Sequence, residues 1–288
     1  MTTLTVLAAG PLTLVEDLGR PGLGALGVGA SGAADAAAHR LANRLVGNPE
    51  QAATLEVLLG GARLRLDGGG WVAVTGAWGD TRGGERRLEP HTATLLAPGE
   101  IVDLPPAAAG LRYVVAVRGG IDVPPVLGSR SWDVLARLGP APVRDGDVLP
   151  IGSEPAVAVP AADLVPIGPP PTGDVRVGLL PGPRRDWFGD DAWAALASAP
   201  WMVTERTDRT GIRLDGPPLP RARSGELPSE GMVPGAIQVS PDGVPTILGV
   251  DGPVTGGYPV LGVVPSVFLD ALAQVRPGQR LRLTPGHR

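Results

Sequence analysis

Glycine and proline recur along the whole sequence and divide it into short apolar segments. The chain contains 43 Gly and 33 Pro, and the intervals between them are rich in Val, Ile and Leu. Glycine and proline interrupt regular elements, whereas short apolar runs bounded by them are typical of strands. The spacing therefore predicts a sheet protein with many turns, not a disordered chain.

Individual segments carry the strand pattern. Residues 62–70 (ARLRLDGGG) alternate apolar and polar side chains, as a half-buried strand does. Residues 71–77 (WVAVTGA) and 113–120 (YVVAVRGG) are apolar runs typical of buried strands. Tight turns that lead into strands are expected within 98–104, 145–151 and 277–283.

Three helices are expected from start and stop signals. The first follows Ser31 as its N-cap and ends at Gly47. The second covers the region near Asp190–Ser198, and the third begins at Ser266 and ends before Pro277.

Length and proline content indicate two domains, since 288 residues exceed the usual single-domain size of about 100–200. The proline-dense segment suggests domains at 1–155 and 173–288 joined by a linker at 156–172. Echoes on the two sides, LRLDG with IRLDG and VRDGDVL with VRPGQRL, occur in the same order. They indicate either an internal duplication or chance similarity in a chain rich in Gly, Arg and Leu.

The residue types that are missing exclude several chemistries. The chain has no Cys, which excludes thiolate catalysis and cysteine-bound zinc. All 25 basic residues are Arg, so no lysine is present to bind phosphate in a Walker loop, form a Schiff base or carry biotin. A three-histidine metal site would need His39, His91 and His287 together, and no metal site is expected.

Charge and hydropathy limit the classes of binding partner and the cellular location that are expected for the protein. The net charge is −4 and the pI about 5.4, which argues against a nucleic-acid surface. No apolar run reaches the ~18 residues of a membrane span, and the first residues lack the basic region of a signal peptide. A cytoplasmic protein is expected.

Three short motifs favour structural roles. GLGALG (22–27) matches a dinucleotide-binding pattern, but no clean βαβ unit surrounds it, so a glycine-rich loop is expected. Ser31 and His39 lie about two helical turns apart, roughly 12 Å, which is too far for a catalytic hydrogen bond. Asp17, in EDLGRPG, is expected to accept backbone N–H bonds in a turn.

The segment TDRTGIRLDG (207–216) combines a turn with two arginines. Asp208 is expected to fix the turn through backbone N–H groups, and Arg209 and Arg213 flank Gly211. Two guanidinium groups beside a glycine turn suit a planar carboxylate, which arginine binds bidentately. The alternative is a solvated arginine pair on an edge strand, and the residues alone leave both interpretations open.

The segment 229–262 places polar residues among glycine-rich turns. Ser229, Glu230 and Gln238 can supply side-chain hydrogen bonds, and Asp251 has the chemistry of a general base. The consecutive glycines of TGGYP let the backbone approach a ligand closely, so that its N–H groups stabilise an oxyanion. The alternative is a set of ordinary hairpins in which these glycines only supply positive φ.

The ordered set of motifs resembles the biotin-dependent carboxyltransferase family. The matching segments are EDLGRPG, SGAADAAAHRLANRLVGNPEQAATLEVLLGG, VTGA, VRGGIDVPPVLGSRS, TDRTGIRLDG, SEGMVPGAIQVSPDG and TGGYP. They run from about residue 4 to residue 284, in order and with matching spacing. The family includes KipA, allophanate hydrolase subunit 2, the carboxyltransferase part of urea carboxylase and the C subunit of 5-oxoprolinase.

The resemblance implies a mainly β fold with two tandem cyclophilin-like β-barrel domains and a few short helices. It implies a KipI-like partner (the B subunit of 5-oxoprolinase or allophanate hydrolase subunit 1) and a small amide substrate. The activity implied first is that of a subunit of an ATP-dependent amidohydrolase that opens 5-oxoproline to glutamate. The alternatives are carboxyl transfer in a urea carboxylase system and a KipA-like binding module without turnover. ATP would bind this chain or its partner, and biotin would arrive on another chain.

The resemblance and the residue chemistry together assign site residues. Proton transfer is assigned to Asp251 and orientation of the amide to Glu230, as the catalytic pair. The substrate-binding residues are expected to be Arg209, Arg213, Ser229, Gln238, Gly256, Gly257 and Tyr258.

The chain also departs from the family pattern. In DGPVTGGYP, Gly252, Pro253 and Val254 replace Arg, Gln and Thr of the family run. Trp132 and Ile212 stand where the family has Thr and Tyr. The resemblance therefore supports the fold more strongly than the substrate.

Overall fold

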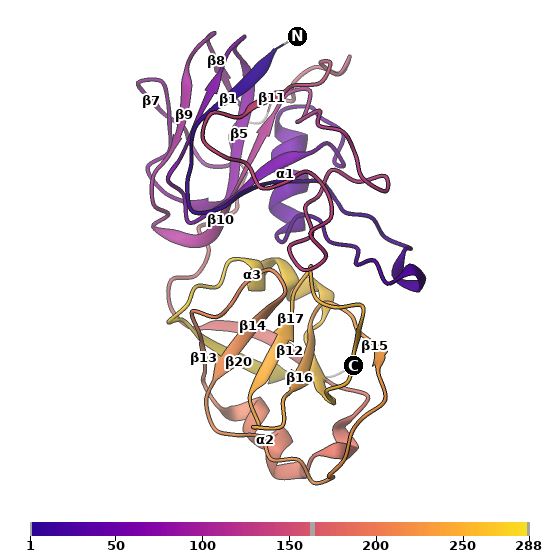
Figure 1. The fold of residues 1–288 in the computed structure, drawn as a ribbon. Helices are drawn as coiled ribbons and strands as arrows, with labels where there is room; N and C mark the ends of the chain where they lie inside the picture. Colours follow the sequence, from indigo (N-terminus) through magenta and orange to yellow (C-terminus); the bar gives the residue numbers. More distant parts are fainter. Residues whose placement is uncertain (1, 162–164, 287–288) are drawn as a thin grey trace. The chain divides into compact units, whose positions relative to one another are not determined.

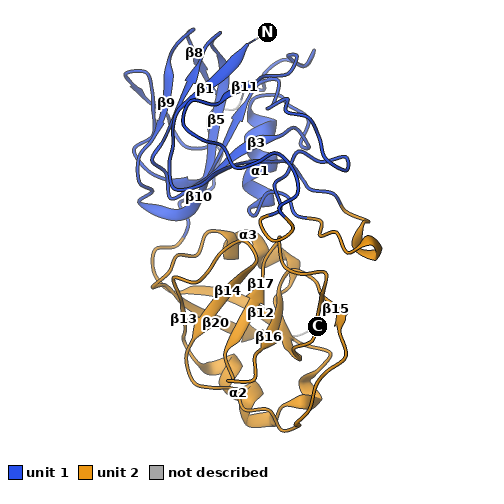
Figure 2. Cartoon of the chain, viewed as in Figure 1, with its two compact units in different colours: residues 1–20, 31–133, 137–170 blue, residues 21–30, 134–136, 171–288 orange. Residues whose placement is uncertain are grey.

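The computed structural model describes residues 2–161 and 165–286 (Figure 1), so part of the predicted linker and His287 lie outside the described residues. The chain divides into two compact units (Figure 2). Unit 1 comprises Met1–Arg20, Ser31–Asp133 and Arg137–Pro170. Unit 2 comprises Pro21–Ala30, Val134–Ala136 and Pro171–Arg288.

Unit 1 contains two antiparallel sheets. The first has the order β11 (Val148–Pro150), β1 (Thr3–Ala9), β4 (Ala62–Leu66), β9 (Ile101–Leu104), β6 (Arg82–Gly83) and β7 (Arg86–Arg87). The second has the order β2 (Thr13–Glu16), β3 (Thr54–Leu58), β10 (Ala109–Val117), β5 (Gly70–Trp78) and β8 (Thr94–Leu96).

The two sheets share one apolar core, and a helix covers the other face of the second sheet. On β5, Val72 and Val74 belong to the core between the sheets, whereas Ala73 packs against α1 (Ala36–Leu45). This division follows from the alternation of side chains along a strand. The predicted N-cap was wrong: Asp35, not Ser31, caps α1 by accepting a hydrogen bond from the Ala38 N–H (2.8 Å).

Unit 2 is built around a closed seven-stranded barrel. Its strands follow one another in the order β12 (Val175–Pro181), β19 (Val260–Val263), β16 (Ala236–Val239), β17 (Pro245–Leu248), β14 (Gly211–Asp215), β13 (Trp201–Val203) and β20 (Arg280–Pro285). The remaining elements are β15 (Glu230–Gly231), β18 (Thr255–Gly256), α2 (Asp190–Ser198), α3 (Leu269–Ala273) and the 3-10 turns η1 (Gly24–Leu26), η2 (Arg185–Trp187) and η3 (Ser266–Phe268).

The register of three barrel strands separates an inner row from an outer row. Ile212, Ile247 and Ile237 lie opposite one another on β14, β17 and β16 and are buried in the barrel core. The adjacent outward row consists of Arg213, Thr246 and Gln238. This outer row forms the base of the site described below.

The prediction of a mainly β chain with a few short helices is confirmed. The second expected helix has the predicted bounds. The third begins at Ser266 as the 3-10 turn η3, and α3 follows only from Leu269, so Ser266 is not the N-cap of an α-helix as expected. Among the described residues, no helix combines the length and apolar character needed to cross a membrane.

Candidate functional site

A pocket of about 370 Å³ lies on the outer surface of the barrel in unit 2. Its base is the outward row of β14, β17 and β16, and turns beyond these strands add the rim. The lining residues are Leu135, Arg206, Thr210, Gly211, Arg213, Gln238, Ser240, Asp242, Val244, Thr246, Leu248, Pro253 and Tyr258.

The pocket carries two arginines and one carboxylate. Among the described residues, neither Arg206 nor Arg213 forms an ion pair with a carboxylate, although Arg213 Nη1 donates a hydrogen bond to the Arg206 carbonyl. The Ser240 hydroxyl donates to Asp242 and holds the pKa of that carboxyl below its ordinary value. Asp242 is therefore ionised near neutral pH, and the lining has one net positive charge.

Gln238 and Tyr258 form one wall of the pocket. The Gln238 Nε2 donates to the Tyr258 carbonyl (3.3 Å) and contacts the Met232 sulfur (3.5 Å). The Arg221 guanidinium lies over the Tyr258 ring, 5.8 Å from its centroid, and donates to the Val239 carbonyl (2.8 Å). Arg221 thus holds the half-exposed tyrosine ring in place.

Gly256 leaves room for the Gln238 side chain. Neither Gly256 nor Gly257 has positive φ, so the hairpin explanation based on backbone conformation was wrong. A Cβ added to Gly256 would lie 2.6 Å from Gln238 Nε2, whereas one on Gly257 would meet only the Leu227 carbonyl at 3.4 Å. Gly256 therefore allows the Gln238 amide to pack against the backbone of β18.

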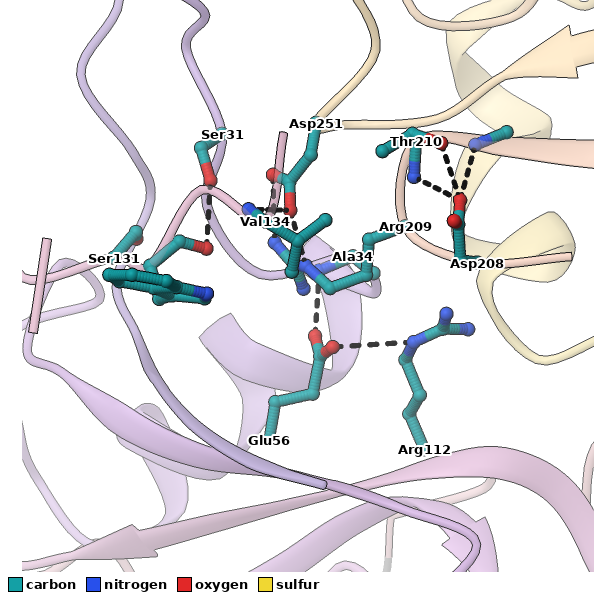
Figure 3. Close-up of polar contacts among 12 residues, drawn as sticks. Ser31, Ala34, Glu56, Arg112, Ser131, Val134, Asp208, Arg209, Thr210 and Asp251 are labelled. Carbon is teal, nitrogen blue, oxygen red and sulfur yellow. Dashed lines mark hydrogen bonds and ion pairs between the residues drawn. The ribbon is translucent and has the colours of Figure 1, made fainter. Parts of the chain in front are cut away.

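Arg209 and Asp251 form a buried ion pair behind the rim. Arg209 Nε donates to Asp251 Oδ2 (2.7 Å) and Nη2 donates to Oδ1 (3.1 Å) (Figure 3). The side chains are 2% and 0% exposed, and neither residue lines the pocket. The same carboxylate accepts the Val134 N–H (3.1 Å).

Asp208 fixes the turn beside Arg209 as the sequence predicts. Its Oδ1 accepts the backbone N–H groups of Thr210 (2.8 Å) and Gly211 (3.2 Å), and also the Thr210 hydroxyl (Figure 3). This arrangement presents Thr210 and Gly211 to the pocket.

The structure divides the predicted site residues into two groups. Arg213, Gln238 and Tyr258 line the pocket. Glu230 lies outside it, where its carboxylate accepts from Arg184 Nε (3.0 Å), and Ser229 is exposed beside it. The functions assigned to these residues from the sequence stay predictions.

Several lining residues were not singled out in the sequence. Thr246 lies in the alternating pattern of β17, and Ser240 and Asp242 belong to the SPDG turn. A prediction of how these strands pair would therefore have placed the three residues near Gln238. Arg206 and Leu135 gave no comparable signal, because they reach the pocket only through the folding of unit 2.

Comparisons with known proteins agree on one family. The family model described as carboxyltransferase domain, subdomain A and B, matches residues 26–285. The 5-oxoprolinase C subunit of Escherichia coli strain K12 is 35% identical over 279 residues, covering 96% of this chain and 89% of that protein. The corresponding Haemophilus influenzae protein is 31% identical over 271 residues, covering 93% and 86%.

Solved structures share the fold. TTHA0988 superposes with a TM-score of 0.89 at 37% identity, covering 99% of this chain and 56% of that chain. The Kluyveromyces lactis urea amidolyase gives a TM-score of 0.89 at 30% identity, covering 99% of this chain and 19% of that chain. The chain thus spans about half of the first of these structures and about a fifth of the second.

Proposed function

The chain belongs to the carboxyltransferase family defined by subdomains A and B, and we propose that it is a subunit of an ATP-dependent 5-oxoprolinase. An enzyme of this type opens the lactam ring of 5-oxoproline to give glutamate. The similarity to the C subunit of 5-oxoprolinase over nearly the full length of both chains supports the assignment.

The observation that carries the proposal is the row formed by Arg213, Thr246 and Gln238 across the pocket. 5-Oxoproline has a carboxylate, a ring amide and two methylene groups. The Arg213 guanidinium suits the carboxylate, which it can bind with charge-assisted hydrogen bonds. Gln238 offers amide hydrogen bonding, and the apolar lining of Leu248 and Pro253 suits the methylene groups.

This chain's part in the reaction is to bind and orient the lactam. Hydrolysis breaks the ring C–N bond, adds hydroxide to the carbonyl carbon and leaves a proton on the departing nitrogen. Asp242 is the ionised carboxylate that lines the pocket, and we assign it to accept the lactam N–H. The proton transfer predicted for Asp251 and the orientation of the amide predicted for Glu230 would both have to act from positions outside the lining.

We assign ATP to a KipI-like partner subunit and place the complex in the cytoplasm. The glycine-rich loop at 22–27 forms the 3-10 turn η1, with neither a strand immediately before it nor an α-helix starting in it, so it does not fit a phosphate-binding loop. The chain has no lysine, so any biotin would be carried by another chain.

Carboxyl transfer to urea is the second candidate. The urea amidolyase of Lachancea kluyveri is 31% identical over 309 residues, covering 97% of this chain and 17% of that protein. The positive pocket favours a substrate with a carboxylate over neutral urea, and we therefore rank this function second. A KipA-like binding role would use the same fold without turnover.

The proposal is tested with this chain, its partner subunit and any companion hydrolase subunit mixed together. ATP hydrolysis and glutamate formation are measured with 5-oxoproline, with urea plus a biotin carrier, and without substrate. We expect glutamate to form only with 5-oxoproline, ATP and this chain all present. Carboxylation of urea would establish the second candidate, and a stable complex without turnover on either substrate would favour the binding module.

A further inference from the structure

We infer that Arg209 and Asp251 are positioning residues that assemble the rim of the pocket from three separate segments of unit 2. They act through the groups they hold and do not touch the substrate. The choice of 5-oxoproline as the substrate in the kinetic test rests on the function proposed above, whereas the positioning role is inferred from contacts within the protein.

Each of the three segments contributes a lining residue and a bond to the pair. The turn at 208–211 provides Thr210 and Gly211, the turn at 249–253 provides Pro253, and Val134–Ala136 provides Leu135. Arg209 lies in the first turn and Asp251 in the second, and the Asp251 carboxylate accepts the Val134 N–H (3.1 Å).

Backbone bonds reinforce the junction between the two turns. The Asp251 N–H donates to the Arg209 carbonyl (3.1 Å) and the Gly249 N–H donates to the Thr210 carbonyl (3.0 Å). Gly249 also leaves room for this approach, since a Cβ there would lie 2.2 Å from the Arg209 carbonyl oxygen. The side-chain bonds between Arg209 and Asp251 and these backbone bonds therefore hold the two turns against each other.

Burial favours positioning over direct catalysis. Asp251 is 0% exposed, and both of its oxygens accept hydrogen bonds from Arg209. An ion pair with two parallel bonds is geometrically specific, and removing one member leaves a buried charge without its partner. A carboxylate held in this way fixes the backbone around it, and it does not line the pocket in which a ligand would bind.

The test combines hydrogen exchange of the chain with kinetics of the full complex. Asp251→Asn keeps an acceptor oxygen but removes the ion pair, and Arg209→Lys keeps the charge but removes the paired bonds. Asp174→Asn is the matched control, because Asp174 forms an exposed 2.7 Å ion pair with Arg282 in the same unit. Exchange is followed in peptides covering 134–136, 208–211, 249–253 and the barrel strands β16 and β17.

We expect exchange to rise about tenfold or more in all three rim segments together, while the barrel strands keep their protection. With 5-oxoproline, KM should rise about tenfold and kcat should change little. The control should leave exchange and kinetics unchanged.

Three results would overturn the inference. Faster exchange in 208–211 alone would show that the pair does not join the segments, and a rise everywhere would show a general loss of stability. A loss of kcat with unchanged KM and unchanged exchange would make Asp251 a catalytic residue. If Asp251→Asn does not fold, the exchange rates and kinetics of Arg209→Lys decide whether the pair has the positioning role. If the parent complex does not turn over 5-oxoproline, the proposed function fails while the exchange rates still decide the positioning role.

Discussion

Arg213 and Thr246 lie directly opposite each other on the antiparallel strands β14 and β17, and Thr246 in turn lies opposite Gln238 on β16. The pairing aligns a guanidinium, a hydroxyl and an amide on the outer face of the barrel. Because side chains alternate along a strand, a shift of one residue would turn Arg213 into the core and expose Ile212. The core of the barrel therefore fixes the order of polar groups in the pocket.

Arg213→Ala should selectively remove the affinity for a carboxylate. Hydrogen bonds to charged groups contribute about 1.5–3 kcal/mol, so binding of 5-oxoproline to the complex should weaken roughly 10- to 100-fold. Binding of 2-pyrrolidinone, which has the lactam but no carboxylate, should change little. Titration calorimetry with both ligands measures the difference, and Arg282→Ala is the control. Equal losses for the two ligands would exclude Arg213 as the carboxylate-binding residue.

Gly256→Ala should disturb the pocket through Gln238. The new methyl group would lie 2.6 Å from Gln238 Nε2, so the amide must move away from the Tyr258 carbonyl. We expect turnover of 5-oxoproline to fall about tenfold, with a change in stability below about 1 kcal/mol, because the displaced amide can rotate into the pocket.

Gly231→Ala is the matched control for that substitution. Gly231 lies in the same two-stranded ribbon, opposite Thr255, and a Cβ there would meet nothing within 4 Å. It should retain full turnover. If both alanine variants behave alike, the close approach at Gly256 has no functional consequence.

The sequence predicted those parts of the fold that depend on local patterns. The alternation of 62–70 appears as β4, and the helix signal at Asp190–Ser198 is observed with the same bounds. Ser31 was mistaken for a helix cap because a serine before an alanine-rich run is a common cap. The structure gives Ser31 a positive φ and places the cap at Asp35, one residue before the helix.

The pocket could be predicted only in part, because it depends on which strands pair. Arg213 and Gln238 were recognisable as ligand-binding residue types, but their common row follows from their pairing with Thr246. Leu135 lies far from the other lining residues in sequence and joins them through the contact of Val134 with Asp251. A contact between residues so far apart in the sequence cannot be predicted from a local residue pattern.

Asp17→Asn should destabilise unit 1 strongly. Asp17 accepts hydrogen bonds from the Ser129 hydroxyl (2.6 Å), the Ser131 hydroxyl (2.6 Å) and the N–H groups of Gly19 (2.8 Å) and Arg130 (2.6 Å). An amide in its place presents two N–H donors to groups that donate, so we expect a loss of about 2–4 kcal/mol in the free energy of unfolding.

Urea denaturation measures this change, and Asp122→Asn provides the comparison. Asp122 is 56% exposed and forms a surface ion pair with Arg130 (2.7 Å), so its replacement should cost less than about 1 kcal/mol. Similar losses for the two variants would contradict the role assigned to Asp17.

His39 makes the stability of unit 1 depend on pH. The ring is fully buried, with Nδ1 beside the Thr54 hydroxyl (3.0 Å) and Nε2 beside the Glu50 carbonyl (3.0 Å). Burial lowers the pKa of His39 from 6.5 to about 4. The hydrogen bond to the Glu50 carbonyl and the charges of Asp17 and Glu56 raise this pKa by less, and the charge of Arg40 lowers it further. Burial also lowers the pKa of His91.

His39→Gln should therefore reduce the loss of stability on acidification. Above pH 6.5 the histidine is neutral in both the folded and unfolded states, so its protonation has no effect on the free energy of unfolding. Between pH 6.5 and about 4 the unfolded chain binds a proton that the folded chain does not, and stability falls by up to about 3 kcal/mol. Below that range both states are protonated and the effect of His39 stops growing. Urea denaturation at pH 7.5, 6, 5 and 4 should show a shallower slope for the variant, and a comparison with His91→Gln separates the slope that His91 contributes. An unchanged slope in His39→Gln would show that His39 is protonated at the same pH in both states, which the burial of its ring argues against.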